Sequence, residues 1–471
     1  MINDFGNMKN KKDKGLARFL APLVLGNMLN PLNSTMLATA VLTIVMAFKQ
    51  EPGAGALLII PLYFTSAIGQ PLMGRLCDVF NPGKINLFGF LLILLSGIVG
   101  VCAQSFGWLI VSRMLLGLGS SAAYPSSMTL IRQRYKALNM DVPGLTLSII
   151  AIASQVSLVF GPFLGGILLE SFGWKGIFFI NIPLVLIGLL LSVKNKNEVK
   201  VVKAQRNQTA LQVFKDLDPL GLLIFCAFLF AFLMALLYPT YLYLKIPAAV
   251  ILLILLVVVE LRHPKPFIDI KILSLNLLLN TTFLRQIGIN FIIYLVLYGL
   301  PQWMEQSKHI NPSSVGLIML PFSLTAMALS LIIAKNKNYK LLLSTGVLCI
   351  IVATIGIFLL NTASPVYFIV SITIVIGAAL GILTVSNQAT LYAEAPDDQV
   401  GICFGLFRTV GYIGAILAGS SLKHQFKAGA TDAGLHSLAV FSLIACVLIV
   451  MFLLPLFFKR RKVVIDLEVT I

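Results

Sequence analysis

Charged side chains are scarce in this sequence. Asp, Glu, Lys and Arg together make up 11% of its 471 residues, whereas 58% are hydrophobic and the mean hydropathy is +0.95. An ordinary soluble domain carries about 25% charged residues, so this chain has too few polar side chains to cover a water-soluble globule of its size. The composition excludes a soluble cytosolic enzyme, a secreted disulfide scaffold and a disordered protein.

Motifs for metal, disulfide and nucleotide chemistry are also missing. The six cysteines are scattered without a CxxC pair or a Cys/His cluster, and no GxxxxGK[ST] phosphate loop occurs. None of the four histidines falls at the centre of an apolar segment. We therefore expect no metal site, no cofactor, no ATP-driven pumping and no enzymatic activity.

Long apolar segments dominate what is present. One crossing of a bilayer needs about 20 predominantly apolar residues. Fourteen candidate segments lie near residues 17–47, 54–76, 86–104, 107–131, 143–168, 176–193, 218–238, 241–261, 281–304, 313–334, 341–360, 364–391, 400–422 and 436–458. Most connections between them are too short to hold a soluble domain, which predicts one all-α integral membrane unit.

The basic residues of the chain carry topological information. The net charge of +17 arises from 35 Lys and Arg against 18 Asp and Glu. The basic residues concentrate near both ends of the chain and in the connection 194–217. Such clustering is the positive-inside bias of membrane proteins. It predicts a multi-pass protein of the cytoplasmic membrane with both termini in the cytoplasm, and it argues against nucleic-acid binding.

Three stretches carry more specific patterns. Gly74 ends the second segment, and Asp78 and Gly83 follow in the connection after it. The fourth segment contains Arg113 and Gly117, and the fifth contains Gly161, Pro162, Gly165 and Gly166. An arginine in the hydrocarbon region costs at least about 2.5 kcal/mol, so Arg113 should face a cavity or a partner. Small residues four positions apart let helices approach closely, and proline interrupts the helical hydrogen bonds.

These stretches resemble motifs of the major facilitator superfamily, including the antiporter signature of its fifth helix. Val79 and Leu116 depart from the residues usual at those positions of the family. With fourteen apolar segments, the chain is similar to the drug:proton antiporter branch, the multidrug efflux transporters associated with antibiotic resistance. The resemblance implies the major facilitator fold, with two six-helix bundles around a central cavity and two additional central helices.

That fold divides the chain into seven parts. They are a cytoplasmic N-terminal tail (1–16), an N-terminal six-helix bundle (17–193), a basic cytoplasmic loop (194–217), two additional transmembrane helices (218–261), a cytoplasmic connection (262–280), a C-terminal six-helix bundle (281–458) and a cytoplasmic tail (459–471).

The branch usually has an aspartate in helix one, where this chain has Asn33. Asparagine cannot titrate. Neutral polar residues instead follow single helix faces. They are Tyr63, Ser66 and Gln70 in the second segment, and Gln286, Asn290, Tyr294 and Tyr298 in the ninth. Helix–helix hydrogen bonding and the lining of a cavity both explain these faces. The candidate cavity residues are Asn30, Asn33, Arg113, Gln155, Asn290, Tyr294 and Asn387.

Glu305, near the end of the ninth segment, is the candidate for a carboxylate that binds and releases a coupling proton; the alternative is that it lies in solvent beside Lys308. Arg113 and Arg408 are the other coupling candidates. One charge moved across 100 mV supplies about 2.3 kcal/mol, so a single coupled proton can drive export.

We therefore expect a secondary active transporter that exports amphipathic drugs or other small hydrophobic compounds by alternating access. A proton, or another cation, would be the coupling ion. Two alternatives are a flippase for a lipid or lipid precursor and a specific exporter of an anionic or zwitterionic metabolite. The expected partners are a small-molecule substrate, the coupling ion and membrane lipids, and we expect a monomer.

Overall fold

The computed structural model is helical throughout the residues it describes. These residues are 2–137, 139, 144–194, 218–238, 240–263, 266, 276–333, 338–394 and 400–458. The predicted loop 194–217, apart from Lys194, and the predicted tail 459–471 lie outside them, as does most of the connection 262–280.

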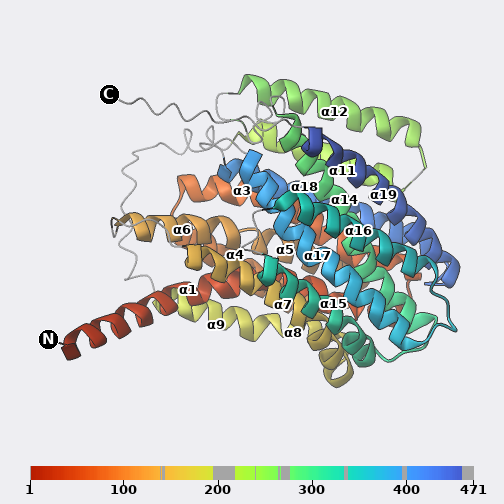
Figure 1. Cartoon of the computed structure of the whole chain (residues 1–471), viewed down its shortest axis with the longest axis horizontal. Helices are drawn as coiled ribbons and strands as arrows, with labels where there is room; N and C mark the ends of the chain where they lie inside the picture. The colour runs from red at the N-terminus through yellow and green to blue at the C-terminus, as the bar shows by residue number, and fades with distance from the viewer. Residues whose placement is uncertain are drawn as a thin grey trace.

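The N-terminal half runs from α1 to α9 (Figure 1). Its elements are α1 (Ile2–Ala38), α2 (Val41–Ala47), the 3₁₀ turn η1 (Pro52–Gly55), α3 (Ala56–Val79), α4 (Pro82–Val101), α5 (Phe106–Ser120), α6 (Ala123–Ala137), α7 (Gly144–Phe172), α8 (Trp174–Phe179) and α9 (Asn181–Lys194). Helix α1 begins at Ile2, so residues predicted as a separate tail continue the first helix.

Two helices stand between the halves in the chain, α11 (Pro219–Leu237) and α12 (Leu242–Arg262). The C-terminal half follows with α14 (Leu277–Gln306), α15 (Pro312–Ile333), α16 (Tyr339–Phe358), α17 (Val366–Glu394), α18 (Val400–Gln425) and α19 (Asp432–Phe458). Helix α12 lies along the upper edge of the molecule in Figure 1. Only 11% of its most apolar stretch is buried, as expected for a helix that faces lipid.

Short polar side chains begin several of these helices. Asn81, Asp218, Asn276 and Asn338 accept hydrogen bonds from backbone N–H groups in the first turns of α4, α11, α14 and α16. Such caps satisfy backbone donors that have no partner inside the helix. They explain why the apolar segments start where they do.

Within the described residues, eleven helical stretches are long and apolar enough to cross a membrane, and twelve if the bent pair α1 and α2 forms one span. The predicted segments 143–168 and 400–422 coincide with α7 and α18. The described apolar part of α7 covers only Phe160–Phe172, which is shorter than a span. An all-helical membrane fold is therefore established, while the number fourteen stays a prediction.

The first predicted segment, 17–47, is broken rather than continuous. Helices α1 and α2 meet at an angle of 65°, although neither proline nor glycine lies at the junction. The Thr39 hydroxyl donates to the Met36 carbonyl oxygen at 3.0 Å and so competes for a helical acceptor. The bend directs α2 toward η1 and α14, where it joins the contact between the two halves.

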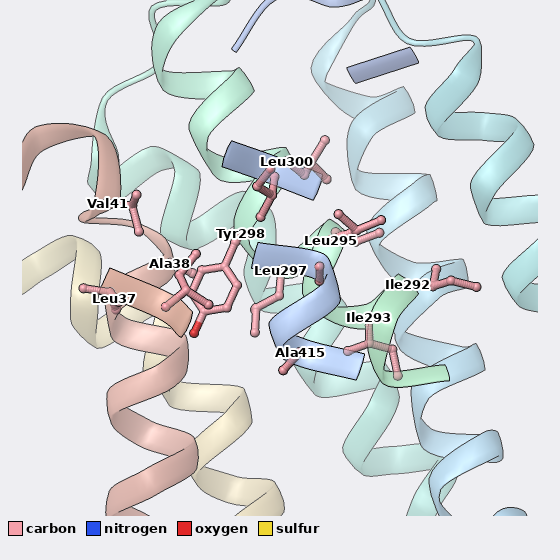
Figure 2. Packing of buried hydrophobic residues seen from close by; sticks show 14 of the residues in the cluster. Leu37, Ala38, Val41, Ile292, Ile293, Leu295, Leu297, Tyr298, Leu300 and Ala415 are labelled. Atoms are coloured by element: carbon pink, nitrogen blue, oxygen red, sulfur yellow. The ribbon is translucent and has the colours of Figure 1, made fainter. Parts of the chain in front are cut away.

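The largest contacts between the halves are those of α7 with α15 and of α3 with α18. Within the N-terminal half, α7 also packs against α1, and α3 packs against α5. One continuous core of buried apolar residues includes members of both halves. Figure 2 shows Tyr298 of α14 extending across this boundary toward Leu37 and Ala38 of α1.

Candidate functional site

Four tyrosines meet where the halves face each other. This tyrosine cluster consists of Tyr63 on α3, Tyr294 and Tyr298 on α14, and Tyr412 on α18. The hydroxyl oxygens of Tyr63 and Tyr298 lie 3.1 Å apart, and both side chains are fully buried. The Tyr63 ring is 4.8 Å from that of Tyr294 and 5.8 Å from that of Tyr412, between ring centroids. The polar faces predicted for the second and ninth segments therefore contact each other.

Arg113 of α5 lies beside this cluster with 1% of its surface exposed. Its Nε donates to the carbonyl oxygen of Leu58 at 2.9 Å, whereas its Nη2 is buried and has no hydrogen-bond partner among the described residues. Leu58 belongs to α3, the helix that carries Tyr63 of the cluster. A buried charge normally requires a paired group, so this half-satisfied guanidinium is an unusual feature of the boundary.

Arg408 of α18 lies at the same boundary. Its guanidinium carbon is 3.9 Å from the ring centre of Tyr124 on α6, so this cation–π contact joins the two halves. Arg408 lies one helical turn before Tyr412 of the cluster on the same helix. Neither Arg408 nor Arg113 forms a salt bridge with an Asp or Glu of the described chain. Two cationic groups thus border the tyrosine cluster without carboxylates.

The helix-one asparagines have partners inside the N-terminal half. Asn33 and Asn181 of α9 exchange two amide hydrogen bonds of 2.6 and 2.8 Å, and both residues are 1% exposed. The Nδ2 of Asn30 donates to the Ser120 hydroxyl at 2.7 Å, and Asn30 itself is half-buried. Asn33 thus joins α1 to α9 in this conformation, and Asn30 joins α1 to α5.

The polar residues of the C-terminal half surround a buried arginine. Arg285 of α14 is fully buried and donates to Asn387 Oδ1, to the Thr282 hydroxyl and to the Phe452 carbonyl oxygen, at 3.1, 2.8 and 2.8 Å. Asn387 is therefore committed to a contact between α17 and α14. Asn290 is half-buried and accepts from Gln286 at 3.2 Å.

Glu305 lies near the C-terminal end of α14 and is half-buried. Its Oε1 is buried and has no hydrogen-bond partner among the described residues. Lys308 donates instead to the carbonyl oxygens of Thr362 and Ser364, at 2.7 and 2.6 Å. The carboxylate is thus neither paired with Lys308 nor fully exposed.

The glycine-rich stretch of α7 faces two helices at once. A methyl group at Gly165 would lie 2.6 Å from the Met36 carbonyl oxygen of α1, and one at Gly161 would overlap Thr35 of the same helix. A methyl group at Gly166 would lie 2.8 Å from the Ser313 Cα of α15. Close backbone approach thus occurs both within the N-terminal half and between the halves.

The other motif residues differ in how tightly they pack. A methyl group at Gly117 would overlap the backbone of α3 at Leu62, whereas Gly74 has open space around its Cα. Gly83 donates its backbone N–H to the Asn81 cap at 2.8 Å. The side chains of Asp78 and Gln155 lie outside the described part of α3 and α7.

Sequence reasoning missed Arg285, Asn181 and the contact of Tyr124 with Arg408. Thr281 and Thr282 lie one helical turn before Arg285, a polar face that could have signalled a buried arginine near the start of α14. Asn181 offers no comparable signal, because its partner Asn33 is 148 positions away in the chain.

Several known proteins are similar to this chain. The MFS-type transporter YwoD of Bacillus subtilis, described as uncharacterized, is 29% identical over 93% of this chain and 96% of its own. The riboflavin transporter RibZ of Clostridioides difficile is 24% identical, over 80% and 81%. The multidrug efflux pump SdrM of Staphylococcus aureus is 25% identical, over 93% and 96%.

A solved structure shares the fold. The bacterial homologue of the human lysosomal transporter Spinster matches 94% of this chain and 98% of its own with a TM-score of 0.67 and 15% sequence identity. The sequence model of the Major Facilitator Superfamily matches residues 23–419. Most of the described helices, both arginines and the tyrosine cluster fall within that range. The chain belongs to the Major Facilitator Superfamily, and it is a multi-pass membrane transporter rather than an enzyme.

Proposed function

We propose that this transporter exports amphipathic small molecules by alternating access, coupled to a proton or other cation gradient. One observation carries the proposal: the glycine-rich stretch of α7 packs backbone to backbone on α1 in its own half and on α15 in the other. A contact formed by backbone and small residues can separate and reform without unlocking interdigitated side chains. That is what a boundary between two moving halves requires.

The relatives support a small-molecule substrate of this kind. One is named a multidrug efflux pump and another a riboflavin transporter. Helices α11 and α12 stand between the halves where the drug:proton antiporter branch has its two extra helices. We assign the chain to that fourteen-helix branch, in the cytoplasmic membrane with both termini in the cytoplasm, as part of the same proposal.

Glu305 is the proposed site of proton coupling. It is a half-buried carboxylate whose Oε1 has no hydrogen-bond partner in the described structure. The equivalent task cannot fall to helix one, because the side chain there is the amide of Asn33, which is already paired with Asn181. Arg113 and Arg408 would respond to the coupling proton through the tyrosine cluster, and Asn30, Asn290 and Tyr294 are the half-buried polar residues that would meet the substrate.

Efflux from inverted membrane vesicles tests this proposal. We expect Glu305→Gln to lose proton-driven accumulation of a fluorescent amphipathic dye by about tenfold or more, because glutamine cannot carry the proton. Passive equilibration of the dye through the protein should remain, since the amide fills the same space.

Glu170→Gln is the matched control. Glu170 is an exposed carboxylate at the end of α7 that accepts a hydrogen bond from the Ser313 hydroxyl at 2.6 Å. This variant should retain gradient-driven accumulation. Full activity of Glu305→Gln would contradict the coupling assignment, and the absence of any gradient-driven dye movement in the wild type would contradict export of amphipathic dyes.

A further inference from the structure

The two charged groups identified beside the tyrosine cluster are both positive. Arg113 is buried against α3, the helix that carries Tyr63, and Arg408 lies over the Tyr124 ring at the boundary between the halves. No Asp or Glu of the described chain forms a salt bridge with either arginine. A cationic ligand at the cluster would meet these two positive groups. An anionic ligand would supply the negative partner that neither arginine has among the described residues.

Arg113 also has unused binding capacity. The guanidinium is 1% exposed, and its Nε is occupied by the Leu58 carbonyl, but its buried Nη2 has no partner in the described structure. A guanidinium presents its donors as a planar fork that fits a carboxylate. A free buried donor beside the boundary is therefore aimed at an oxygen that the protein itself does not supply in this conformation.

The rings of the cluster add a requirement for flat aromatic shape. The rings of Tyr63 and Tyr412 are inclined by 27° with centroids 5.8 Å apart, and those of Tyr294 and Tyr298 by 16° with centroids 6.1 Å apart. Near-parallel, offset rings at these distances stack favourably. Tyr298 reaches across the boundary, and its hydroxyl oxygen lies 3.1 Å from that of Tyr63.

We propose that the tyrosine cluster and Arg113 form a binding site for flat aromatic anions, with the carboxylate or phenolate on Arg113 Nη2 and the ring between the tyrosines. This inference rests on the proposed function, because the hydroxyl contact between Tyr63 and Tyr298 must open when the halves separate. It narrows the substrate class from amphipathic compounds in general to aromatic compounds with an anionic group.

Calorimetric titration of the purified full-length protein in lipid nanodiscs tests the site. The probes share the naphthalene ring system and carry an anionic, a neutral or a cationic group at position 2: 2-naphthoate, 2-naphthylmethanol and 2-naphthylmethylammonium. We expect naphthoate to bind about tenfold or more tighter than the ammonium compound, as a charge-assisted bond to a buried guanidinium allows. Arg113→Gln should remove most of this preference while leaving the affinity for the neutral alcohol unchanged.

Two further variants separate binding from folding. Arg113→Lys keeps the positive charge and should keep a reduced preference for naphthoate. Arg134→Gln removes a matched arginine of α6, whose guanidinium carbon lies 4.4 Å from the centre of the Phe19 ring on α1. This variant should retain the wild-type preference.

Two results would overturn the inference. One is that the wild-type protein binds the ammonium compound as tightly as naphthoate, or more tightly; this result needs no variant. The other is an unchanged preference in folded Arg113→Gln. The titration uses no gradient, so it tests binding separately from transport. If naphthoate bound as expected but no substrate moved in vesicles under a gradient, the proposed export function would fail while the binding site stood.

Discussion

Replacing Gly166 with alanine is expected to reduce transport by about tenfold or more, because the added methyl group prevents α7 and α15 from closing. It would lie 2.8 Å from the Ser313 Cα and 2.9 Å from the Pro312 carbonyl oxygen. Both atoms belong to backbone, which cannot rotate away as a side chain tip can. The contact is reciprocal, since a methyl group at Gly316 of α15 would lie 2.7 Å from the Pro162 carbonyl oxygen.

The size of this effect follows from the cost of overpacking the contact between α7 and α15. Overpacking a tight contact costs about 1–3 kcal/mol, which changes the balance between two conformations by roughly 5- to 150-fold. The cost falls only on the conformation in which the halves meet through α7 and α15. Gly166→Ala should therefore fold normally and accumulate with these helices apart.

Gly107→Ala is the matched control. Gly107 is exposed in the first turn of α5, and the nearest atom to the added methyl group would be the Ser105 Oγ at 3.7 Å. This variant should transport at the wild-type rate, as measured by dye efflux in the same vesicles. If Gly166→Ala transported as well as Gly107→Ala, close packing of α7 on α15 would not be required for the transport cycle.

Replacing Arg285 with alanine is expected to lower the free energy of unfolding by about 3 kcal/mol. Arg285 is fully buried and joins α14 to α17 through Asn387 and to α19 through the Phe452 carbonyl oxygen. Truncation leaves a cavity and unpaired acceptors on two neighbouring helices. Removing a buried charge also relieves a desolvation cost, but the loss of several charge-assisted hydrogen bonds and of a packed side chain is expected to outweigh it.

Thermal unfolding in nanodiscs measures this change against Lys245→Ala. Lys245 also donates to a carbonyl oxygen, that of Tyr238 at 2.7 Å, but the contact is exposed. The control should change stability by less than about 0.5 kcal/mol. Equal unfolding midpoints for the two variants would show that the hydrogen bonds of Arg285 do not hold the C-terminal half together.

Much of the helical architecture could be predicted, because the apolar runs that form it are local in the sequence. The spacing of Tyr63, Ser66 and Gln70 also indicated an inward face on α3, and the same reasoning applied to Asn290, Tyr294 and Tyr298 on α14. The structure brings these two faces together at Tyr63 and Tyr298. Helical periodicity is sufficient for such predictions, since it requires no knowledge of the partner.

Pairings between distant residues could not be predicted. Asn33 was expected to line a cavity, but its position in the sequence does not reveal that Asn181 satisfies its amide. The bend between α1 and α2 has no proline or glycine at its junction to predict it; the Thr39 hydroxyl bonds the Met36 carbonyl oxygen there, and Gly165 of α7 packs against both residues. Arg285 lies near the start of an apolar segment, where a snorkelling side chain was equally consistent with the sequence.

Distances between spin labels test alternating access most directly. In a variant without the six native cysteines, one label at Ser171 and one at Asn311 report on the ends of α7 and α15, beside the contact of Gly166 with Ser313. A second pair, at Ser171 and Met46, lies within the N-terminal half and serves as the control. We predict one short distance between Ser171 and Asn311 at rest, and a second, longer one when a proton gradient and substrate are applied. The control distance should stay constant. A single unchanged distance between Ser171 and Asn311 in a variant that still transports would contradict this prediction.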